Sequence, residues 1–434
     1  DPDNLQALTT RGKAAKASGR PDSAIMDFKR VLGLKPDYLE GYLQLADAYV
    51  MNRQFPMAKE ALRKGLQRSP AQRNMLMSMY RICLLDNDYK QAELHLRALV
   101  EKYPDAISAQ AKLGDFYLAL NDEDAARREY SEIVLKSPRS AVGHIKLSRL
   151  YLRQGKVDNA VSQLRKGYHL VERNQSIAAE LTGILIAAER FKDALALCND
   201  RLGKNPKEAF ALNLKGETFV KMKKYDQALK AFERATKIEP MWAEASNNLA
   251  AVYLQQGKIK AAVKNLKSSL DKNPKNPAAY LTLGKIYEQD KKYDKAMEIY
   301  ESAIQAVPGF WTAANHLALL LCEQKPMADS LKRATELALN AYKMKPGQPA
   351  IIDTLGWIYY QKGEYQLALQ LYRQIEDLIK DHHTLLNYHM AMTLLKTDHT
   401  DEAKARLRAA LKDKTEFMGR SQAEKTLNLL NAST

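Results

Sequence analysis

Apolar residues recur along this 434-residue chain in paired stretches of about a dozen residues, each with the spacing of one helix face. The pairs repeat every 34 residues, and a glycine or a group of charged residues separates the two stretches of most pairs. No alternating β-branched run bounded by hairpin turns interrupts them. The pattern therefore predicts an all-α protein made of helix–turn–helix units, each burying its apolar face against the next.

One alanine position marks the unit throughout the chain. It is occupied by Ala24, Ala58, Ala92, Ala126, Ala160, Ala194, Ala228, Ala262, Ala296, Ala334 and Ala368. Four residues later most units carry a bulky or apolar residue, namely Phe28, Leu62, Leu96, Tyr130, Leu164, Cys198, Phe232, Leu266, Tyr300 and Tyr372. We expect the alanine to lie where two helix backbones approach too closely for a larger side chain.

Prolines end most units, because proline cannot continue a helical hydrogen-bond ladder. They stand at Pro2, Pro36, Pro70, Pro104, Pro138, Pro206, Pro240, Pro274 and Pro308. Glu172 takes the expected place once, and Pro346 and Lys380 continue the series. Since Pro2 lies one period before Pro36, the sequence predicts at least one further repeat upstream of residue 1.

The first stretch of each unit adds a small residue and, three positions later, often a ring. The small residues are Gly12, Ala46, Gly114, Ser148, Gly216, Ala250, Gly284, Ala318 and Gly356. The rings are Tyr49, Tyr117, Tyr151, Phe219, Tyr253, Tyr287 and Tyr359. In these positions the chain resembles the tetratricopeptide repeat family nearly end to end. The resemblance implies a right-handed α-solenoid, or superhelix, of about twelve repeats.

Repeats are expected to start near 5, 39, 73, 107, 141, 175, 209, 243, 277, 311, 349 and 383. The twelfth is weaker and carries its alanine at Ala403. In the tenth, four additional residues around Pro326 are expected to lengthen the turn between the helices. We therefore predict one continuous solenoid over 1–417, followed at 418–434 by a capping helix, near 420–431, and a tail.

The net charge of +16 raises the question of nucleic acid binding. Basic clusters such as 221–224 fall in turns between helices, and the aromatic residues near them occupy core positions, so they are not free to stack on bases. The sequence therefore disfavours nucleic acid and favours an acidic partner surface. No apolar run reaches membrane-spanning length and no signal peptide is present, although an anchor outside this segment would not be visible.

Catalytic and metal-binding motifs are not found. The chain has no phosphate-binding glycine loop, no nucleophile elbow and no H-E-x-x-H, so we expect neither an enzyme nor a cofactor. Cys83 and Cys198 fall at core positions and Cys322 lies nearer the groove-facing side, and none has zinc-ligand spacing. Near the C-terminus lie His382, His383, His389 and His399. Their spacing favours packing or solvent exposure over a metal site.

Function is therefore expected on the surface of the solenoid. In tetratricopeptide folds the first helix of each repeat lines a concave groove. At its groove positions the earlier repeats carry an apolar stripe of Leu43, Met77, Leu84, Leu118, Ile145, Leu152 and Ile186, with Met51 and Leu85 beside it. This stripe is expected either to accept an amphipathic partner segment or to be covered in part by packing between repeats.

The later repeats carry polar residues in one register of the same helix. These are Asn213, Asn247, Asn315, Asp353 and Asn387, with Glu217, Glu244, Lys285, Trp357 and Tyr360 nearby. Asparagine is a mediocre helix-interior residue, and its amide both donates and accepts hydrogen bonds. The row is expected either to hold the backbone of an extended peptide or to serve local capping and hydration.

A narrower resemblance concerns Asp353-Thr354-Leu355-Gly356-Trp357, followed by Gly363 and Ala368. This segment is similar to repeats of bacterial envelope tetratricopeptide proteins linked to exopolysaccharide export or exosortase systems. It implies a protein-binding scaffold in the bacterial cell envelope or periplasm, with the cytoplasm as the alternative. Two other functions stay open, namely the recruiting domain of a larger enzyme and a binder of an acidic polymer.

Overall fold

The computed structural model describes residues 3–171, 174–379, 383–412, 414, 417 and 419–432, and these residues contain helices but no strand. Pro2, Glu172, Lys380 and His382 lie outside the described residues. The chain divides into two compact units, residues 1–197 and 198–434, with the boundary inside α12. The prediction of a single solenoid over 1–417 stays a prediction across this boundary.

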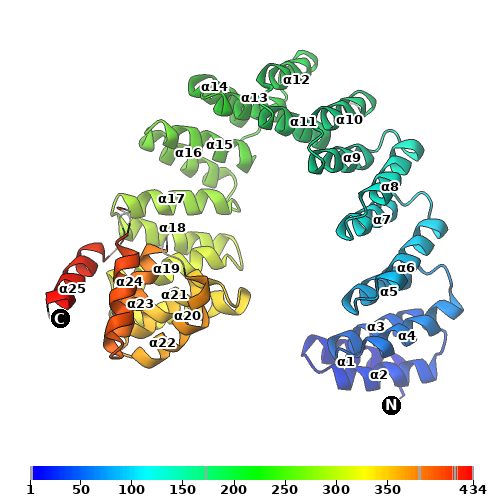
Figure 1. Cartoon of the computed structure of the whole chain (residues 1–434), viewed down its shortest axis with the longest axis horizontal. Helices are drawn as coiled ribbons and strands as arrows, with labels where there is room; N and C mark the ends of the chain where they lie inside the picture. The colour runs from blue at the N-terminus through cyan, green and yellow to red at the C-terminus, as the bar shows by residue number, and fades with distance from the viewer. Residues whose placement is uncertain are drawn as a thin grey trace. The chain divides into compact units, whose positions relative to one another are not determined.

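The first unit consists of paired helices (Figure 1). Its helices are α1 (Leu5–Ala17), α2 (Pro21–Leu34), α3 (Leu39–Met51), α4 (Phe55–Arg68), α5 (Arg73–Leu85), α6 (Tyr89–Lys102), α7 (Ile107–Ala119), α8 (Glu123–Lys136), α9 (Ala141–Arg153), α10 (Val157–Leu170) and α11 (Gln175–Ala187). The next helix, α12 (Phe191–Lys204), crosses into the second unit.

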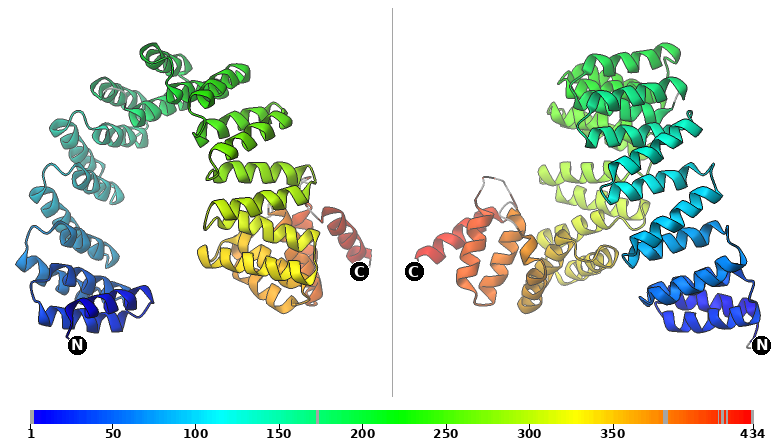
Figure 2. Two further views of the ribbon diagram at one scale, coloured as in Figure 1. Left: turned by 180° about the vertical axis from the view of Figure 1, so that it is seen from behind. Right: turned by 45° about the vertical axis from the view of Figure 1, so that its right-hand side comes forward.

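The second unit continues the same pairing (Figure 2). Its helices are α13 (Ala209–Lys221), α14 (Tyr225–Ile238), α15 (Ala243–Gln255), α16 (Ile259–Lys272), α17 (Pro277–Gln289), α18 (Tyr293–Ala306), α19 (Trp311–Gln324), α20 (Ala328–Met344), α21 (Pro349–Gln361), α22 (Tyr365–Gln374), the 3-10 turn η1 (Glu376–Leu378), α23 (Thr384–Lys396), α24 (Thr400–Ala410) and α25 (Arg420–Ala432). From α1 to α21 each odd-numbered helix begins at a residue where the sequence pattern starts a repeat.

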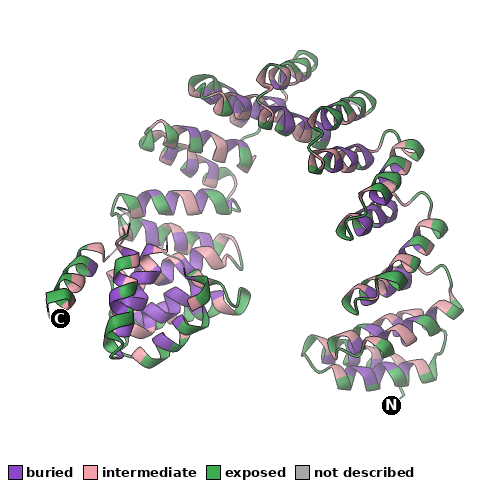
Figure 3. Cartoon of the chain, in the orientation of Figure 1, coloured by how far each residue is buried: buried purple, intermediate pink, exposed green. Residues whose placement is uncertain are grey.

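Each unit has two layers of helices. Each pair packs internally, and odd-numbered helices also pack on one another, as α9 does on α11 in the first unit and α19 on α21 in the second. The faces between the layers are buried, whereas the outward faces of the even-numbered helices are exposed (Figure 3). The described residues therefore form an all-α solenoid fold of stacked helix–turn–helix repeats.

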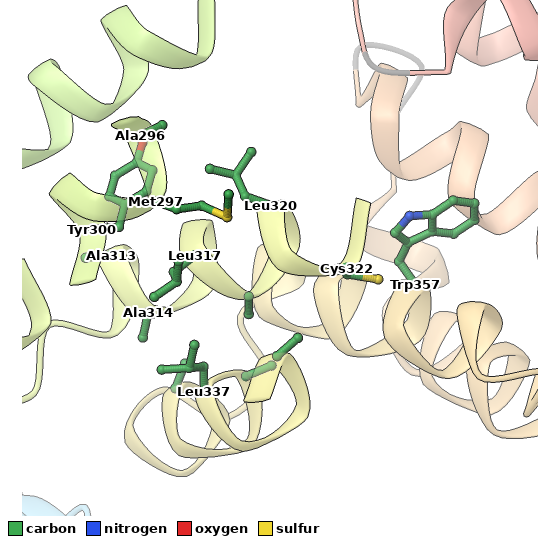
Figure 4. Close-up of a cluster of buried hydrophobic side chains, with 14 of the residues drawn as sticks. Ala296, Met297, Tyr300, Ala313, Ala314, Leu317, Leu320, Cys322, Leu337 and Trp357 are labelled. Atoms are coloured by element: carbon green, nitrogen blue, oxygen red, sulfur yellow. The ribbon is translucent and has the colours of Figure 1, made fainter. Parts of the chain in front are cut away.

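The recurring alanine is fully enclosed. All eleven alanines of the series, and Ala403 of the last repeat, are 0% exposed. In the second unit Ala296 lies in the core with Tyr300, Leu317 and Leu337 (Figure 4). A methyl group is therefore the largest side chain that the second helix of each repeat accommodates at this point.

Small and large side chains complement each other between the two helices of a repeat. Glycine of the first helix faces a ring of the second in the pairs Gly12–Phe28, Gly114–Tyr130, Gly216–Phe232, Gly284–Tyr300 and Gly356–Tyr372. Where the small position holds Ala, Ser or Thr, the large one holds a smaller residue, as in Ala46–Leu62, Ser148–Leu164, Thr182–Cys198 and Ala250–Leu266. The third repeat departs from this rule, with Tyr80 at the small position.

The turn inside every repeat except the tenth contains one residue in the left-handed conformation. Glycine supplies it in four repeats, as at Gly19 with a φ of 67°, and non-glycine residues such as Asn87, Asn121 and Lys223 supply it in others. A side chain in this conformation costs about 1–2 kcal/mol, which the packing of the two helices offsets. The left-handed residue recurs with the period of the repeat because these repeats share the same three-residue turn.

The tenth repeat corrects one prediction from the sequence. The turn between α19 and α20 is no longer than its counterparts, because α19 ends at Gln324 and α20 begins at Ala328. The four additional residues instead lengthen the helices, to 14 residues in α19 and 17 in α20. Pro326 stops α19, and Ala328, Asp329 and Ser330 extend α20 at its N-terminal end, where the acidic Asp329 lies favourably near the positive end of the helix dipole.

Helix α25 packs on α24 at the C-terminal end of the second unit. Ala423 is 0% exposed, and Leu427 and Leu430 pack against the neighbouring core, while Leu429 is exposed. One face of α25 therefore covers the last repeat, and the other faces solvent.

Candidate partner-binding surfaces

The apolar stripe of the first unit lies on its odd-numbered helices. All seven predicted residues are half-buried. Met77, Leu84 and Leu118 pack against one core cluster, Ile145, Leu152 and Ile186 against another, and Leu43 against a third. Packing between repeats thus covers part of each side chain and leaves part of it accessible.

Two large apolar residues next to the stripe are more exposed than its members. Met51 at the end of α3 is 46% exposed, and Leu85 at the end of α5 is 54% exposed. Side chains of this kind gain free energy when a partner covers them, about 25 cal/mol for each Å² removed from water. The apolar stripe, with Met51 and Leu85, therefore forms a candidate surface for an apolar or amphipathic segment.

The amide row begins as an internal network between α13 and α15. Asn213 is 1% exposed, and its Nδ2 donates to Oε1 of Glu217 at 2.8 Å. Nδ2 of Asn248 donates to Oδ1 of Asn213 and to Oε1 of Glu217, both at 3.1 Å. Burial and the nearby charge of Glu244 raise the pKa of Glu217, although the two amides oppose this. Both polar ends of Asn213 are thus already used within the protein.

Asn247 forms a second internal pair, with the residue that caps α17. Its Nδ2 and Oδ1 exchange hydrogen bonds with Asn276 at 3.2 and 3.1 Å. Oδ1 of Asn276 also accepts from the backbone N–H of Ala279, which satisfies one of the free donors at the start of α17. The amide at position 247 therefore connects one repeat to the helix start of the next.

The remaining members of the row are also buried. Nδ2 of Asn315 donates to the backbone oxygen of Ala350 at 3.3 Å, and Oδ1 of Asn387 accepts from Arg406 at 3.3 Å. Asn315 and Asp353 are 8% and 7% exposed, and Asn387 is 0% exposed. Neighbouring repeats cover most of the row, although Asn247 is half-buried and Oδ1 of Asn315 has no hydrogen-bond partner among the described residues. These contacts agree with the local-capping alternative, and binding of a peptide backbone by the row stays a prediction.

Asp353 belongs to a buried charged cluster that the sequence pattern did not reveal. Nδ1 of His389 lies 2.9 Å from Oδ1 of Asp353, and its Nε2 lies 3.5 Å from Oε1 of Glu323. The His389 side chain is 0% exposed and stacks on Trp357 with ring centroids 4.0 Å apart. Burial alone would lower the pKa of His389, but the two carboxylates outweigh it and raise the pKa to about 9.

Trp357 and Tyr360 are brought together with this cluster. Their rings stack at 4.6 Å, and Trp357 is 6% exposed while Tyr360 is half-buried. Lys285 is exposed on α17 and is not part of the cluster. The one trace of the cluster in the sequence is the carboxylate at position 353 in a row otherwise made mostly of asparagine, and it does not identify His389 or Glu323 as its partners.

The cysteines are free and buried. Cys83, Cys198 and Cys322 are each 0% exposed, and burial raises the pKa of all three thiols, that of Cys198 to about 12.

Among the described residues no group of three or more His, Cys, Asp or Glu side chains is arranged to hold a metal ion. None of the described helices combines the length and apolarity that a membrane crossing requires.

Stacked helix–turn–helix pairs define a helical-repeat protein. A tetratricopeptide repeat model matches residues 15–79, 84–150 and 253–321, and two further models of this repeat match residues 216–257 and 352–381. Together they cover more than half of the chain. The chain belongs to the tetratricopeptide repeat family.

Known proteins are similar to this chain at low identity. A BBSome complex member BBS4 homolog of Drosophila melanogaster is 23% identical over 402 residues, which are 89% of this chain and 76% of that protein. Anaphase-promoting complex subunit CDC16 of Saccharomyces cerevisiae is 25% identical over 243 residues, 55% of this chain and 28% of that protein. Protein O-mannosyl-transferase TMTC1 of Homo sapiens is 24% identical over 196 residues, 45% of this chain and 21% of that protein.

A solved structure also aligns with nearly the whole chain. It is that of the APC/C hetero-tetramer Cut9-Hcn1, which covers 98% of this chain and 96% of the solved chain at 15% identity, with a TM-score of 0.44. Tetratricopeptide proteins in general mediate protein–protein interactions, and this is the class of function that the family membership gives.

Proposed function

We propose that this protein is a non-enzymatic scaffold that holds an amphipathic helix of a partner protein against the odd-numbered helices of its first unit. The observation that carries the proposal is the apolar stripe, which stays partly accessible although each residue packs against the core. A helix that presents apolar residues at i, i+3, i+4 and i+7 would cover such a surface. The relatives named as members of multi-protein complexes support the same class of function.

The test compares two pairs of exposed apolar residues on the two layers of the first unit. Met51→Glu with Leu85→Glu places charges beside the stripe, whereas Met26→Glu with Leu135→Glu places them on α2 and α8, where those side chains are 72% and 75% exposed. Partners retained from native extracts by the immobilised protein are identified by mass spectrometry. We expect the first variant to lose about tenfold or more of its retained partner and the second to keep it.

Because all four side chains are substantially exposed, both variants are expected to keep the helicity and melting temperature of the wild type. Equal retention by the wild type and by both variants would overturn the stripe as the binding surface. Equal loss in both variants would show that added negative charge, and not the odd-numbered layer, decides retention.

We further propose that the scaffold works in the bacterial cell envelope, where it would recruit partners for envelope assembly or exopolysaccharide export. The similarity of the segment at 353–368 to repeats of envelope proteins supports this proposal. Fractionation of the native cells should place the protein with the envelope or periplasm, and deletion of the gene should reduce exported polysaccharide. Recovery in the cytoplasm with unchanged export would contradict it.

A second candidate is the partner- or substrate-recruiting domain of a larger enzyme. It is favoured by the similarity to protein O-mannosyl-transferase TMTC1, of which the chain spans only about a fifth. The sequence of the full-length gene separates the two candidates. A catalytic domain in the same polypeptide would favour the recruiting domain, and further repeats with an anchor would favour the scaffold.

A further inference from the structure

The segment 221–275 of the second unit carries an unusual excess of unpaired positive charge. It holds twelve Lys or Arg against five Asp or Glu, a net charge of +7 out of the +16 of the chain. All its residues are described, and none of the twelve cations forms an ion pair within 4 Å of a carboxylate. Elsewhere such pairs are frequent, as between Arg149 and Glu180 at 2.7 Å. Within this segment the chain itself leaves its cations unneutralised.

Three of these lysines meet at one groove. Lys237 of α14 and Lys264 and Lys272 of α16 line a groove of about 590 Å³, and all three are exposed. Leu249 and Tyr253 of α15 are also among its lining residues. The groove therefore combines residues of two even-numbered helices with residues of the odd-numbered helix between them, and it is distinct from the apolar stripe of the first unit.

The other polar groups of the groove are partly used within the protein. Glu233, its single carboxylate, accepts a hydrogen bond from the hydroxyl of Tyr253 at 2.7 Å. Nδ2 of Asn265 donates to the backbone oxygen of Ser246 at 2.8 Å. The ammonium groups are thus the charged donors without an internal ion-pair partner, and they outnumber the carboxylate three to one.

We propose that the groove between α14 and α16 binds an acidic segment of a partner protein. Lysine ammonium groups are mobile point charges, which suit carboxylates spaced along a flexible chain. Nucleic acid is disfavoured because Tyr253 is the single aromatic ring in the lining of the groove, and the nearby Trp242 is stacked on Phe210 at 6.4 Å. The inference rests on the proposed scaffold role but adds a second surface and the charge of what it binds.

The experiment measures the affinity of a fluorescein-labelled Glu/Gly peptide by fluorescence anisotropy at low and at physiological salt. Lys237→Glu, Lys264→Glu and Lys272→Glu are combined in one variant. The matched control combines Lys166→Glu, Lys295→Glu and Lys332→Glu, which are exposed lysines outside the groove with the same change in net charge. We expect about a tenfold or larger loss of affinity for the groove variant and less than about a twofold loss for the control.

A substitution that increases the affinity for the peptide gives a second test of the groove as the binding site. Glu233→Gln removes the only carboxylate of the groove and is expected to strengthen peptide binding by about twofold or more, with the largest gain at low salt. Because all these positions lie at the surface, circular dichroism is expected to show unchanged helicity in every variant.

Equal losses in the groove and control variants would overturn the proposal, since the overall charge alone would then account for binding. A single-stranded oligonucleotide or an anionic polysaccharide could instead bind more tightly than the peptide and lose this binding in the groove variant. That result would overturn the proposal of an acidic protein segment and identify the polymer as the ligand of the groove. These outcomes are separate from the test of the apolar stripe, because the probe is defined and the groove residues lie in the second unit.

Discussion

Asp353→Ala is expected to lower the free energy of unfolding of the second unit by about 3–5 kcal/mol at pH 6. The substitution leaves protonated His389, which is 0% exposed, without the carboxylate 2.9 Å from its Nδ1. Only Glu323, at 3.5 Å, remains to balance the buried charge. Chemical unfolding followed by circular dichroism, with hydrogen exchange of α19, α21 and α23, measures the loss.

Asp294→Ala is the matched control, because this aspartate is 77% exposed and pairs with Lys325 at 2.8 Å on the surface. Its removal is expected to change the free energy of unfolding by less than about 1 kcal/mol. A loss in the Asp353 variant no larger than that of the control would show that the buried charge is compensated in another way.

The same cluster predicts how stability depends on pH. Because folding raises the pKa of His389 from its ordinary 6.5 to about 9, the protonated ring contributes stability fully below pH 6.5. This contribution, about 3 kcal/mol, is lost as the pH rises from 6.5 through 9. The Asp353→Ala variant is expected to lose most of this dependence, so the difference in unfolding free energy between wild type and variant should shrink toward pH 9.

Gly216→Ala is expected to destabilise the second unit by about 2 kcal/mol, although alanine is the better helix former. A Cβ at this position would lie 2.5 Å from Cε1 of Phe232, and the ring has no room to withdraw because it is 1% exposed. Phe232→Leu alone should cost about 1–2 kcal/mol by leaving a cavity.

The two substitutions together are expected to restore most of the stability. The double variant reproduces the pair Ala250–Leu266 of the next repeat, in which alanine stands where glycine stood and leucine where the ring stood. Denaturant unfolding of all four proteins gives the coupling free energy, expected at about 2 kcal/mol in favour of the double variant. Additive losses would contradict size matching between these positions.

Much of the fold was predictable because the same sequence pattern recurs in every repeat, so each helix is indicated many times over. Alternating apolar faces, the alanine series and the prolines predicted the helices, and the starts of the odd-numbered helices coincide with the predicted repeat starts up to Pro349. The tenth repeat was misjudged because a proline shows where one helix ends, but not whether the next helix begins earlier. Ala328, Asp329 and Ser330 extend α20 at its N-terminal end, where an aspartate is favourable although it is a poor residue for a helix interior.

The candidate surfaces were harder to predict, since burial within a solenoid depends on the neighbouring repeat. The register of Asn213 and Asn315 indicated a common helix face, but the periodicity of one helix does not tell how closely the next helix covers that face. The proximity of His389 to Asp353 and Glu323 joins α23, α21 and α19, one helix from each of three consecutive repeats. No local pattern encodes such a contact.

The complementary sizes of the glycine–ring and alanine–leucine pairs restrict how such a chain can be recombined. An exchange between repeats that crosses over in the loop after the second helix keeps both members of each pair together. A crossover in the turn after Gly216 could join that glycine to Leu266 and leave a void, whereas the reciprocal product would place Ala250 against Phe232. The loops between repeats are therefore the places where units can be duplicated, deleted or exchanged without disturbing the core.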